Sequence, residues 1–394
     1  DHFRHVNDTL GYAQGDRLLA AVASRIRASL PDGVFVARLS GDEFVVVLEA
    51  QPPAAARGLG ELLLQAMTRE FAIGQDRIQI STSIGLVACA EPGQAPGTMM
   101  RYADLALHRA KQSGRNCMEV YSRSLGAEFD RQMLLESQLR LALERGELLL
   151  HYQPQWDVRS GALVGWEALL RWRSAELGEV APSEFVPVAE RSGLILAIGG
   201  WVLREACRQL RAWREAGLAP GTMAVNLSAR QFRQRDLVDM VGQVLRENQL
   251  PPSSLELEVT ESMLMDDLTV AAAVLDELKK LGVQIAIDDF GTGYSSLGYL
   301  KAFPLHCLKI DRSFIADVPG NASDAAIVRT IIALADNLGL RVLAEGVETQ
   351  AQLGFLREHH CAQMQGYLKA PPLPVDQCLA LLQQSQSEEV MPAP

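Results

Sequence analysis

The sequence predicts two domains: an α+β domain at 1–121 and a larger α/β domain, a TIM-like (β/α)8 barrel, at 147–385. Three observations support this division. The chain has 394 residues, which is long for one domain. Few strands and segregated helices occupy the first region, whereas short apolar runs alternate with amphipathic segments throughout the second. A helical linker at 122–146 joins the two regions, and a tail follows at 386–394.

The composition is that of a folded protein in water. Hydrophobic residues make up 48% of the chain, charged residues 22%, and the net charge is −11. This acidic balance argues against binding to a nucleic-acid polymer, which requires a basic surface. A small phosphodiester ligand stays open, because bound divalent cations invert the local potential.

The sequence also bears on location. No apolar stretch reaches the ~18 residues that span a bilayer, so we expect no membrane contact by this segment. Six scattered cysteines without a C-x-x-C pair indicate reduced thiols and a cytoplasmic protein. The chain begins at Asp1 without a signal peptide, and we interpret it as a piece of a longer protein. Anchoring of that parent to the inner membrane by preceding segments stays open.

The first domain is expected to begin with a helix and a strand pair. The run Gly15–Leu30 has helical periodicity, and strands flank the acidic turn Ser40–Phe44, SGDEF. Stretches rich in alanine, proline or glycine are predicted to be loops. The elements expected after the turn are a loop at 51–56, a helix at 58–72, a strand at 79–89, a loop at 91–98 and a helix at 102–113.

The linker is predicted from residues 125–146, which have helical periodicity and no internal breaker. Gly146 is the expected stop of this helix. A rigid connection of this kind could pass a change in the first domain to the second. An ordinary helix belonging to one domain is the alternative.

The second domain contains eight candidate strands separated by amphipathic helices. This alternation favours a closed (β/α)8 barrel, with a doubly wound open sheet as the alternative. The eight runs are LLLHYQP, LVGWEALLRW, TMAVNLS, LELEVTES, VQIAIDDF, HCLKID, LRVLAEGVE and CAQMQGYL.

Polar residues lie in or at the ends of six consecutive runs. In a parallel barrel the carboxyl ends of the strands meet at one rim, where such enzymes place their chemistry. We therefore expect these residues to converge on one pocket. They are Glu167, Asn226, Glu258, Glu261, Asp288, Asp289, Lys309, Asp311, Glu345 and Glu348.

A metal site explains this convergence better than separate structural roles do. A single acid at a strand end is more often a helix N-cap than a ligand, and Asp288 with Asp289 could be capping residues. Lys309 alone could be a surface lysine. Carboxylates from several strands would repel one another unless cations neutralised them, and hard oxygen ligands favour Mg²⁺ or Mn²⁺ over zinc. Two ions about 4 Å apart would activate a water against a phosphodiester, with the adjacent aspartates as the bridge.

At these residues the segment resembles the EAL family of cyclic di-GMP phosphodiesterases. The motifs run in family order across the whole second domain, with Glu167-Ala168-Leu169 at their head. Lys369-Ala370-Pro371 is a slight departure from the usual pattern. The other motifs are NLSARQF, LELEVTES, AIDDFGTGYSSL, LKIDRSF, LAEGVET and QGYLKAPPLP.

The resemblance implies hydrolysis of cyclic di-GMP to linear pGpG with two Mg²⁺ or Mn²⁺ ions in the active site. Glu261 would anchor the loop Phe290–Ser296, whose ordering the family couples to metal binding and to formation of a homodimer. The resemblance further implies that the first metal is bound by Glu167, Asn226, Glu258 and Asp288, and the second by Asp288 and Asp289. The attacking water would be positioned and deprotonated by Lys309 and Glu345. Support and contact with the ligand would come from Glu348, Gln365, Gln153 and Arg171.

The first domain resembles a GGDEF-type diguanylate cyclase domain. The turn SGDEF follows FRHVND and GYAQGD and precedes LALHRAKQSGRN, in family order. A hairpin turn with solvated acids would be the alternative for the pentapeptide alone. The resemblance implies binding of GTP with Mg²⁺. The metal and the neighbouring phosphate would be contacted by Gly41, Asp42 and Glu43, the guanine by Asn7 and Asp16, and further phosphates by Lys111 and Arg115.

Three departures bear on cyclase activity. Ser40 replaces the first glycine of the motif, and the family's other metal-binding aspartate would lie two residues before Asp1, so the domain is N-terminally incomplete here. Pro31 and Val34 stand at the arginine and aspartate positions of the product-inhibition signature. We therefore expect no product-inhibition site of that type.

Three functions remain open at this point. The first is a phosphodiesterase regulated by a GTP-binding domain. The second is a bifunctional diguanylate cyclase and phosphodiesterase. The third is a non-catalytic cyclic di-GMP receptor, which the complete set of acids disfavours.

Overall fold

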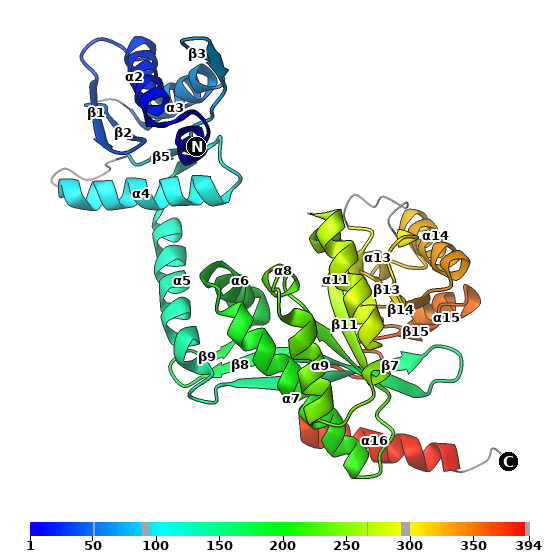
Figure 1. Cartoon of the computed structure of the whole chain (residues 1–394). Coiled ribbons are helices and arrows are strands. Elements are labelled where there is room, and N and C mark those ends of the chain that lie inside the picture. Colours follow the sequence, from blue (N-terminus) through cyan, green and yellow to red (C-terminus); the bar gives the residue numbers. More distant parts are fainter. Residues whose placement is uncertain (50–51, 89–93, 266, 293–299, 391–394) are drawn as a thin grey trace. The chain divides into compact units, whose positions relative to one another are not determined.

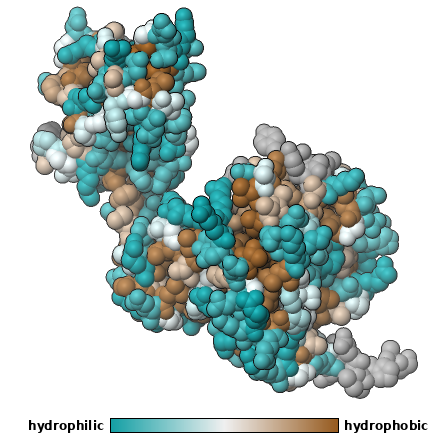
Figure 2. All heavy atoms as spheres, viewed as in Figure 1, coloured by the Kyte–Doolittle hydropathy of each residue, from teal (hydrophilic) through white to brown (hydrophobic). Residues whose placement is uncertain are grey.

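The computed structural model describes residues 1–394 except 50–51, 89–93, 266, 293–299 and 391–394 (Figure 1). The chain divides into two compact units, Asp1–Leu134 and Leu135–Pro394. On the face that Figure 2 shows, hydrophobic residues reach the surface of each unit in patches among hydrophilic ones, as on ordinary folded proteins. Among the described residues, no helix combines the length and the apolarity needed to cross a bilayer.

The first unit is an α+β domain built from short paired strands and helices. Strands β1 and β2 form an antiparallel pair around the acidic turn, β3 pairs with β4, and β5 pairs in parallel with β6. Its elements are α1 (Phe3–Leu10), α2 (Tyr12–Ser29), β1 (Phe35–Ser40), β2 (Glu43–Val47), α3 (Pro53–Met67), β3 (Phe71–Ile73), β4 (Asp76–Ile78), β5 (Ile84–Leu86), α4 (Pro96–Gln112) and β6 (Met118–Val120).

Several predicted boundaries in this unit are wrong, chiefly because proline starts two helices. Pro53 and Pro96 occupy the first helical position of α3 and α4, where proline fits well, so residues 53–56 and 96–98 are helix rather than loop. The helix predicted at 58–72 ends at Met67, because Phe71 and Ile73 turn their side chains into the core from β3. The strand predicted at 79–89 is reduced to β5, and residue 89 lies outside the described chain.

Helix α5 (Arg123–Ala142) crosses the boundary between the two units. Its last two turns supply Leu135, Leu139 and Ala142 to the core of the second unit. The helix ends at Ala142, one turn before the predicted stop, and Gly146 adopts the positive φ of 66° in the turn that follows.

The second unit is a closed eight-stranded barrel, so the predicted TIM-like fold is confirmed. The sheet order runs from β10 through β15 and β7 to β8, and a further pairing of β8 with β10 closes it, which excludes the open-sheet alternative. The barrel strands are β7 (Leu148–Asp157), β8 (Leu163–Ser174), β10 (Thr222–Asn226), β11 (Leu255–Thr260), β12 (Gln284–Phe290), β13 (Cys307–Ile310), β14 (Arg341–Ala344) and β15 (Gln363–Met364).

One strand departs from the expected all-parallel arrangement. β7 is antiparallel to both of its neighbours, β8 and β15, and it reaches β8 through a hairpin rather than a helix. The expectation of a helix between every pair of strands is therefore wrong for the first pair. In the hairpin register Gln153 lies opposite Glu167 and Gln155 opposite Gly165, which places two glutamines beside a predicted metal ligand.

Helices cover the outside of the barrel and bury its main core (Figure 1). The aromatic rings of Trp166 and Trp213 pack 5.2 Å apart between β8 and α7, with Tyr152 of β7 at the same distance from Trp213. The remaining elements are β9 (Gly178–Val180), α6 (Pro182–Ser192), α7 (Ile195–Glu215), α8 (Ala229–Phe232), α9 (Leu237–Glu247), a 3-10 turn (Pro252–Ser254), α10 (Glu261–Met265), α11 (Leu268–Leu281), α13 (Arg312–Ile315), α14 (Ala322–Leu338), α15 (Gln350–Glu358) and α16 (Val375–Val390).

Candidate active site

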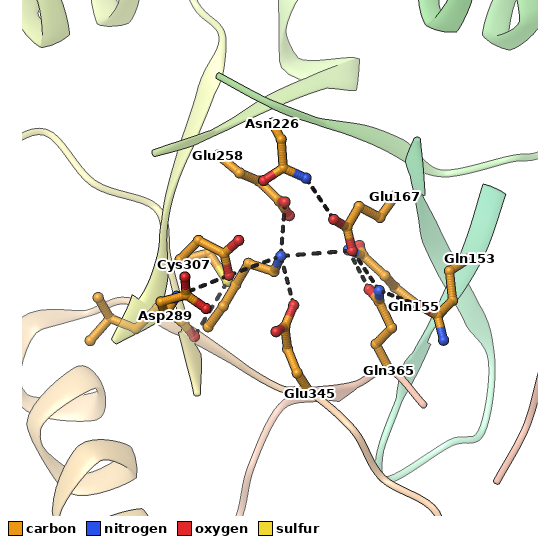
Figure 3. Close-up of polar contacts among 12 residues, drawn as sticks. Gln153, Gln155, Glu167, Asn226, Glu258, Asp289, Cys307, Glu345 and Gln365 are labelled. Atoms are coloured by element: carbon orange, nitrogen blue, oxygen red, sulfur yellow. Dashed lines mark hydrogen bonds and ion pairs between the residues drawn. The ribbon is translucent and has the colours of Figure 1, made fainter. Parts of the chain in front are cut away.

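The barrel brings the predicted polar residues to one end of its interior. Along a strand alternate side chains share a face, so inward positions recur every second residue. In the parallel register Asn226 pairs with Glu258, and the neighbouring strands carry Glu167 and Asp288 at the same end. Figure 3 shows the side chains of Glu167, Asn226 and Glu258 converging on a common centre.

Lys309 occupies that centre. Its ammonium Nζ lies 2.7 Å from Glu345 Oε1, 2.8 Å from Glu258 Oε2, 3.2 Å from Asp288 Oδ1 and 3.8 Å from Glu167 Oε2. The side chain is 1% exposed, so it is a fully buried cation and not a surface lysine. One ammonium therefore faces four carboxylates.

The excess of acids over cations shifts the ionisation of the cluster. Burial, followed by the charges of Glu167 and Asp288, raises the pKa of Glu258 well above its usual range, although Lys309 opposes the shift. Burial likewise raises the pKa of Glu345 to about 7, against the opposing effect of Lys309. Burial disfavours the Lys309 cation, yet the surrounding carboxylates outweigh it and hold the pKa of Lys309 well above its usual value. The protein alone does not balance the charge of this site.

Both oxygens of Glu167 are held by amides. Asn226 Nδ2 donates to Glu167 Oε1 at 2.7 Å, and Gln365 Nε2 donates to Oε2 at 2.5 Å. Gln365 Nε2 also donates to Gln153 Oε1 at 2.9 Å. The carboxylate of Glu167 is therefore fixed in direction before any ligand binds.

Asp288 and Asp289 face the same site because the strand is irregular there. Successive side chains of a regular strand point to opposite faces. The register of β12 against β13 shifts between Ile287 and Phe290, and Asp289 has a φ of 54°, in the left-handed region that few residues other than glycine, asparagine and aspartate adopt. Local strain of this kind is typical of functional sites.

The donor set fits divalent cations with oxygen ligands. Oxygen atoms of Asp288, Asp289 and Glu345 lie within 4.8 Å of one another. Oε1 of Glu258 is buried and has no hydrogen-bond partner among the described residues, as expected of a ligand atom awaiting a cation. Carboxylate and amide oxygens without cysteine or histidine are the set preferred by Mg²⁺ and Mn²⁺.

The other predicted residues of the barrel surround this centre to different degrees. Arg171 lies half-buried on β8, and burial lowers its pKa while Tyr367 and Glu167 oppose that effect. Glu261 Oε2 accepts a 3.4 Å hydrogen bond from the backbone N of Gly291, at the start of the predicted loop. Residues 293–296 of that loop lie outside the described chain. Glu348 is exposed, and among the described residues no hydrogen bond or ion pair joins its carboxylate to the cluster.

Asp311 has a structural role. Its side chain caps α13 by accepting a hydrogen bond from the backbone N of Ser313 at 2.9 Å. This is the capping role that a strand-end acid most often has. The side chain of Asp311 also interacts with that of Asp289, where its charge and hydrogen bond add to the effect of burial and raise the pKa of Asp289, so Asp311 adjoins the cluster.

In the first unit, the carboxylate of Asp1 accepts hydrogen bonds near the predicted residue Arg115. The hydroxyls of Ser81 and Ser83 donate to the carboxylate of Asp1 at 2.9 Å. The backbone N of Asn116, next to the predicted residue Arg115, donates to the same carboxylate at 3.3 Å.

The predicted guanine-binding residues lie on α1 and α2. A Cβ added to Gly15 would fall 1.9 Å from Asn7 Oδ1, so the bare glycine makes room for that amide. Asp16 lines a surface depression together with Arg38 and Phe44. Gly41 has a φ of 51° in the turn before Asp42 and Glu43, and both of these acids are exposed.

The sequence interpretation missed Gln155. This side chain is 2% exposed and donates from Nε2 to Gln365 Oε1 at 3.1 Å (Figure 3). The available signal was the period of two, which places Gln155 on the same face of β7 as Gln153.

Comparison with known proteins covers both units. The EAL domain family matches residues 136–372, and the family described as diguanylate cyclase, GGDEF domain, matches residues 1–117. The bifunctional diguanylate cyclase/cyclic di-GMP phosphodiesterase MucR of Pseudomonas aeruginosa is 47% identical over 380 residues, 96% of this chain and 56% of the relative. The cyclic di-GMP phosphodiesterase NbdA of the same organism is 43% identical over 375 residues, 95% of this chain and 48% of the relative. The chain thus spans about half the length of these relatives.

Solved structures resemble the second unit. The PaMucR phosphodiesterase in complex with c-di-GMP is 50% identical, has a TM-score of 0.61, and covers 62% of this chain and 99% of its own. That neighbour is a complex with c-di-GMP.

Proposed function

Because this chain belongs to the EAL domain family and carries a GGDEF domain before its barrel, we propose that the barrel hydrolyses cyclic di-GMP to linear pGpG. The observation that carries the proposal is the single buried ammonium of Lys309 among four carboxylates. The relatives named as cyclic di-GMP phosphodiesterases and the c-di-GMP complex support the choice of substrate.

The ligands proposed for two Mg²⁺ or Mn²⁺ ions are the carboxylates and amide at the strand ends. When bound, such ions would supply Lewis-acid stabilisation of the phosphodiester and lower the pKa of the attacking water. Asp288 would bind both ions, and Asp289, whose carboxylate lies in the same cluster, would bind the second ion with it. The proposed set is Glu167, Asn226, Glu258 and Asp288 for the first ion and Asp288 and Asp289 for the second.

The protein's own groups account for proton movement and orientation. Glu345 accepts the proton of the attacking water through its carboxylate, one oxygen of which lies within 4.8 Å of oxygens of Asp288 and Asp289. Lys309 orients Glu345 through their 2.7 Å ion pair. Attack of the water oxygen on phosphorus breaks one phosphorus–oxygen bond of the ring, and the leaving oxygen takes up a proton to give the linear product.

Substrate recognition is proposed for residues around the metal ligands. The half-buried guanidinium of Arg171 would donate to a phosphate oxygen. Gln153 and Gln365 would contact the dinucleotide or the ions, and Glu348 would support them from the exposed rim. Glu261 would hold the following loop through Gly291, and by family resemblance the barrel would act as a homodimer.

The deciding experiment measures hydrolysis of cyclic di-GMP with Mg²⁺ or Mn²⁺. Wild type should produce pGpG, while Glu167→Ala and Lys309→Ala should lose at least ~100-fold of the rate, since each removes a central group. Lys280→Ala is the matched control, because Lys280 is an exposed lysine on α11 paired with Glu277. Binding without turnover by the wild type would refute the phosphodiesterase and favour a receptor.

The first unit is proposed to bind GTP with Mg²⁺ and to regulate the barrel. Its proposed contacts are Asn7, Asp16, Gly41, Asp42, Glu43, Lys111 and Arg115. The proposed limits are 1–121 for this domain, 122–146 for the linker, 147–385 for the barrel and 386–394 for the tail. GTP should change the hydrolysis rate, and an unchanged rate at saturating GTP would contradict regulation by this domain.

A second candidate is a bifunctional enzyme whose GGDEF domain also makes cyclic di-GMP. The observation favouring it is the 47% identity to MucR, a relative named as bifunctional. The test is incubation of the Glu167→Ala variant, whose barrel should be inactive, with GTP and Mg²⁺, so that any cyclic product accumulates. Absence of product would exclude this candidate.

A further inference from the structure

The side chain of Gln155 begins a chain of amide hydrogen bonds that reaches the proposed metal ligand Glu167. Gln155 Nε2 donates to Gln365 Oε1 at 3.1 Å, and Gln365 Nε2 donates to both Gln153 Oε1 and Glu167 Oε2. The chain ends where Gln153 Nε2 donates to the backbone oxygen of Ala370 at 3.3 Å. All three glutamines are at least 90% buried, so water does not readily replace these bonds.

The chemistry of the neighbours fixes the direction of every bond in this chain. An ionised carboxylate accepts hydrogen bonds only, so Glu167 requires the NH₂ group of Gln365. The backbone oxygen of Ala370 likewise requires the NH₂ group of Gln153, whose oxygen then faces Gln365. Both hydrogens of Gln365 Nε2 are thereby used, and its oxygen needs a donor from the other side. Gln155 supplies that donor.

A rotated Gln365 amide would place oxygen against oxygen at Glu167, at the 2.5 Å separation that the hydrogen bond now occupies. The donor on Gln155 opposes that rotation, because it too would lose its acceptor. Gly165 makes room for this arrangement: a Cβ there would fall 3.0 Å from Gln155 Oε1 and 2.6 Å from Thr222 Oγ1.

We propose that Gln155 is a positioning residue for the metal site, because its amide locks Gln365 in the orientation that fixes the carboxylate of Glu167. The inference rests on the proposed function, in which Glu167 binds a divalent ion. Gln155 reaches neither the ammonium of Lys309 nor the acids around it through any hydrogen bond among the described residues, so its effect passes through Gln365.

The test titrates the full chain with Mn²⁺ by calorimetry, which reports metal affinity without turnover. Gln155→Glu keeps the shape but replaces the donor by an acceptor, and Gln155→Leu removes the donor without adding charge. Residues that orient metal ligands through hydrogen bonds change affinity by ~10–100-fold. We expect at least a ~10-fold weaker affinity in Gln155→Glu and a smaller loss in Gln155→Leu. The rate at saturating substrate should recover at high Mn²⁺ with an unchanged KM for substrate.

Gln363→Leu is the matched control. Gln363 also lies on a barrel strand and accepts a hydrogen bond from Arg341 at 3.2 Å, and Arg341 pairs with Glu256 rather than with an acid of the proposed metal site. Its variant should keep wild-type Mn²⁺ affinity. Wild-type affinity in a folded Gln155→Glu, or an equal loss in Gln363→Leu, would overturn the inference. If Gln155→Glu does not fold, Gln155→Leu decides by the same comparison. Absence of Mn²⁺ binding by wild type would refute the proposed metal site itself and the inference with it.

Discussion

Replacing Glu345 with glutamine should stabilise the metal-free barrel at pH 8 and at the same time abolish hydrolysis. Burial raises the pKa of this carboxyl from 4.5 to about 7, and the difference corresponds to about 3 kcal/mol at ~1.4 kcal/mol per tenfold change in ionisation. Between these two values the folded state holds a proton that the unfolded state has lost. Stability therefore falls as the pH rises through this window, and the loss is complete above it.

Glutamine is neutral at every pH and imitates the protonated acid. In EDTA, Glu345→Gln should therefore exceed the wild type by up to ~3 kcal/mol in unfolding free energy at pH 8, and by less than ~1 kcal/mol at pH 5. Hydrolysis should fall by ~100-fold or more, because the variant lacks the group that accepts the proton of water.

Urea unfolding followed by tryptophan fluorescence isolates the barrel, because all five tryptophans of the chain lie between residues 156 and 213. Glu176→Gln, a change of the same type at an exposed position between β8 and β9, is the control and should leave stability unchanged at both pH values. If Glu345→Gln is no more stable than wild type at pH 8, burial does not raise the pKa of Glu345 as argued above. Retained hydrolysis would refute the role of Glu345 as the base.

Three further predictions concern the site and the helix before the barrel. Lys309→Met should lower the unfolding free energy of the metal-free barrel by about 3–5 kcal/mol at pH 8, because it leaves buried carboxylates without their cation. Urea unfolding in EDTA measures this loss, and later addition of Mn²⁺ should restore part of it. A loss below ~1 kcal/mol would contradict the ion pairs. Asp289→Val should lower the unfolding free energy by about 1–3 kcal/mol, because a β-branched side chain is strained at the φ of 54°, and Asp289→Gly should lower it much less. Both variants should bind Mn²⁺ more weakly. Equal stability of the two variants in urea would contradict the strain. Leu139→Ala should lower barrel stability by about 2–5 kcal/mol in the fluorescence assay, whereas the exposed Met133→Ala should not; an unchanged midpoint in Leu139→Ala would show that α5 does not complete the core.

The sequence located the centre of the site because strand ends are visible in a sequence. A run of apolar residues that stops at an acid marks the end of a strand, and parallel strands place those ends together. Glu258 and Lys309 are found in this way, whereas Glu167 lies inside its apolar run, and the structure brings both acids to the ammonium of Lys309.

Other features depend on three-dimensional packing that no local pattern contains. Nothing in the residues of β7 says that it runs against its neighbours, because antiparallel and parallel strands share the same alternation. The left-handed turn at Asp289 depends on how the strand meets its neighbour, not on the acid itself. Gln155 resembles any polar residue of a strand until Gln365, from the other end of the domain, lies against it.

The helix shared by the two units has a consequence for how such proteins are assembled by recombination. Leu135, Leu139 and Ala142 belong to the core that the barrel needs, although they precede its first strand. A gene fusion that joined a new sensor directly to β7 would leave an apolar face of the barrel uncovered. The unit that can be exchanged between proteins is therefore the barrel together with the second half of α5, so that each new input domain is attached to a helix that is already part of the barrel unit.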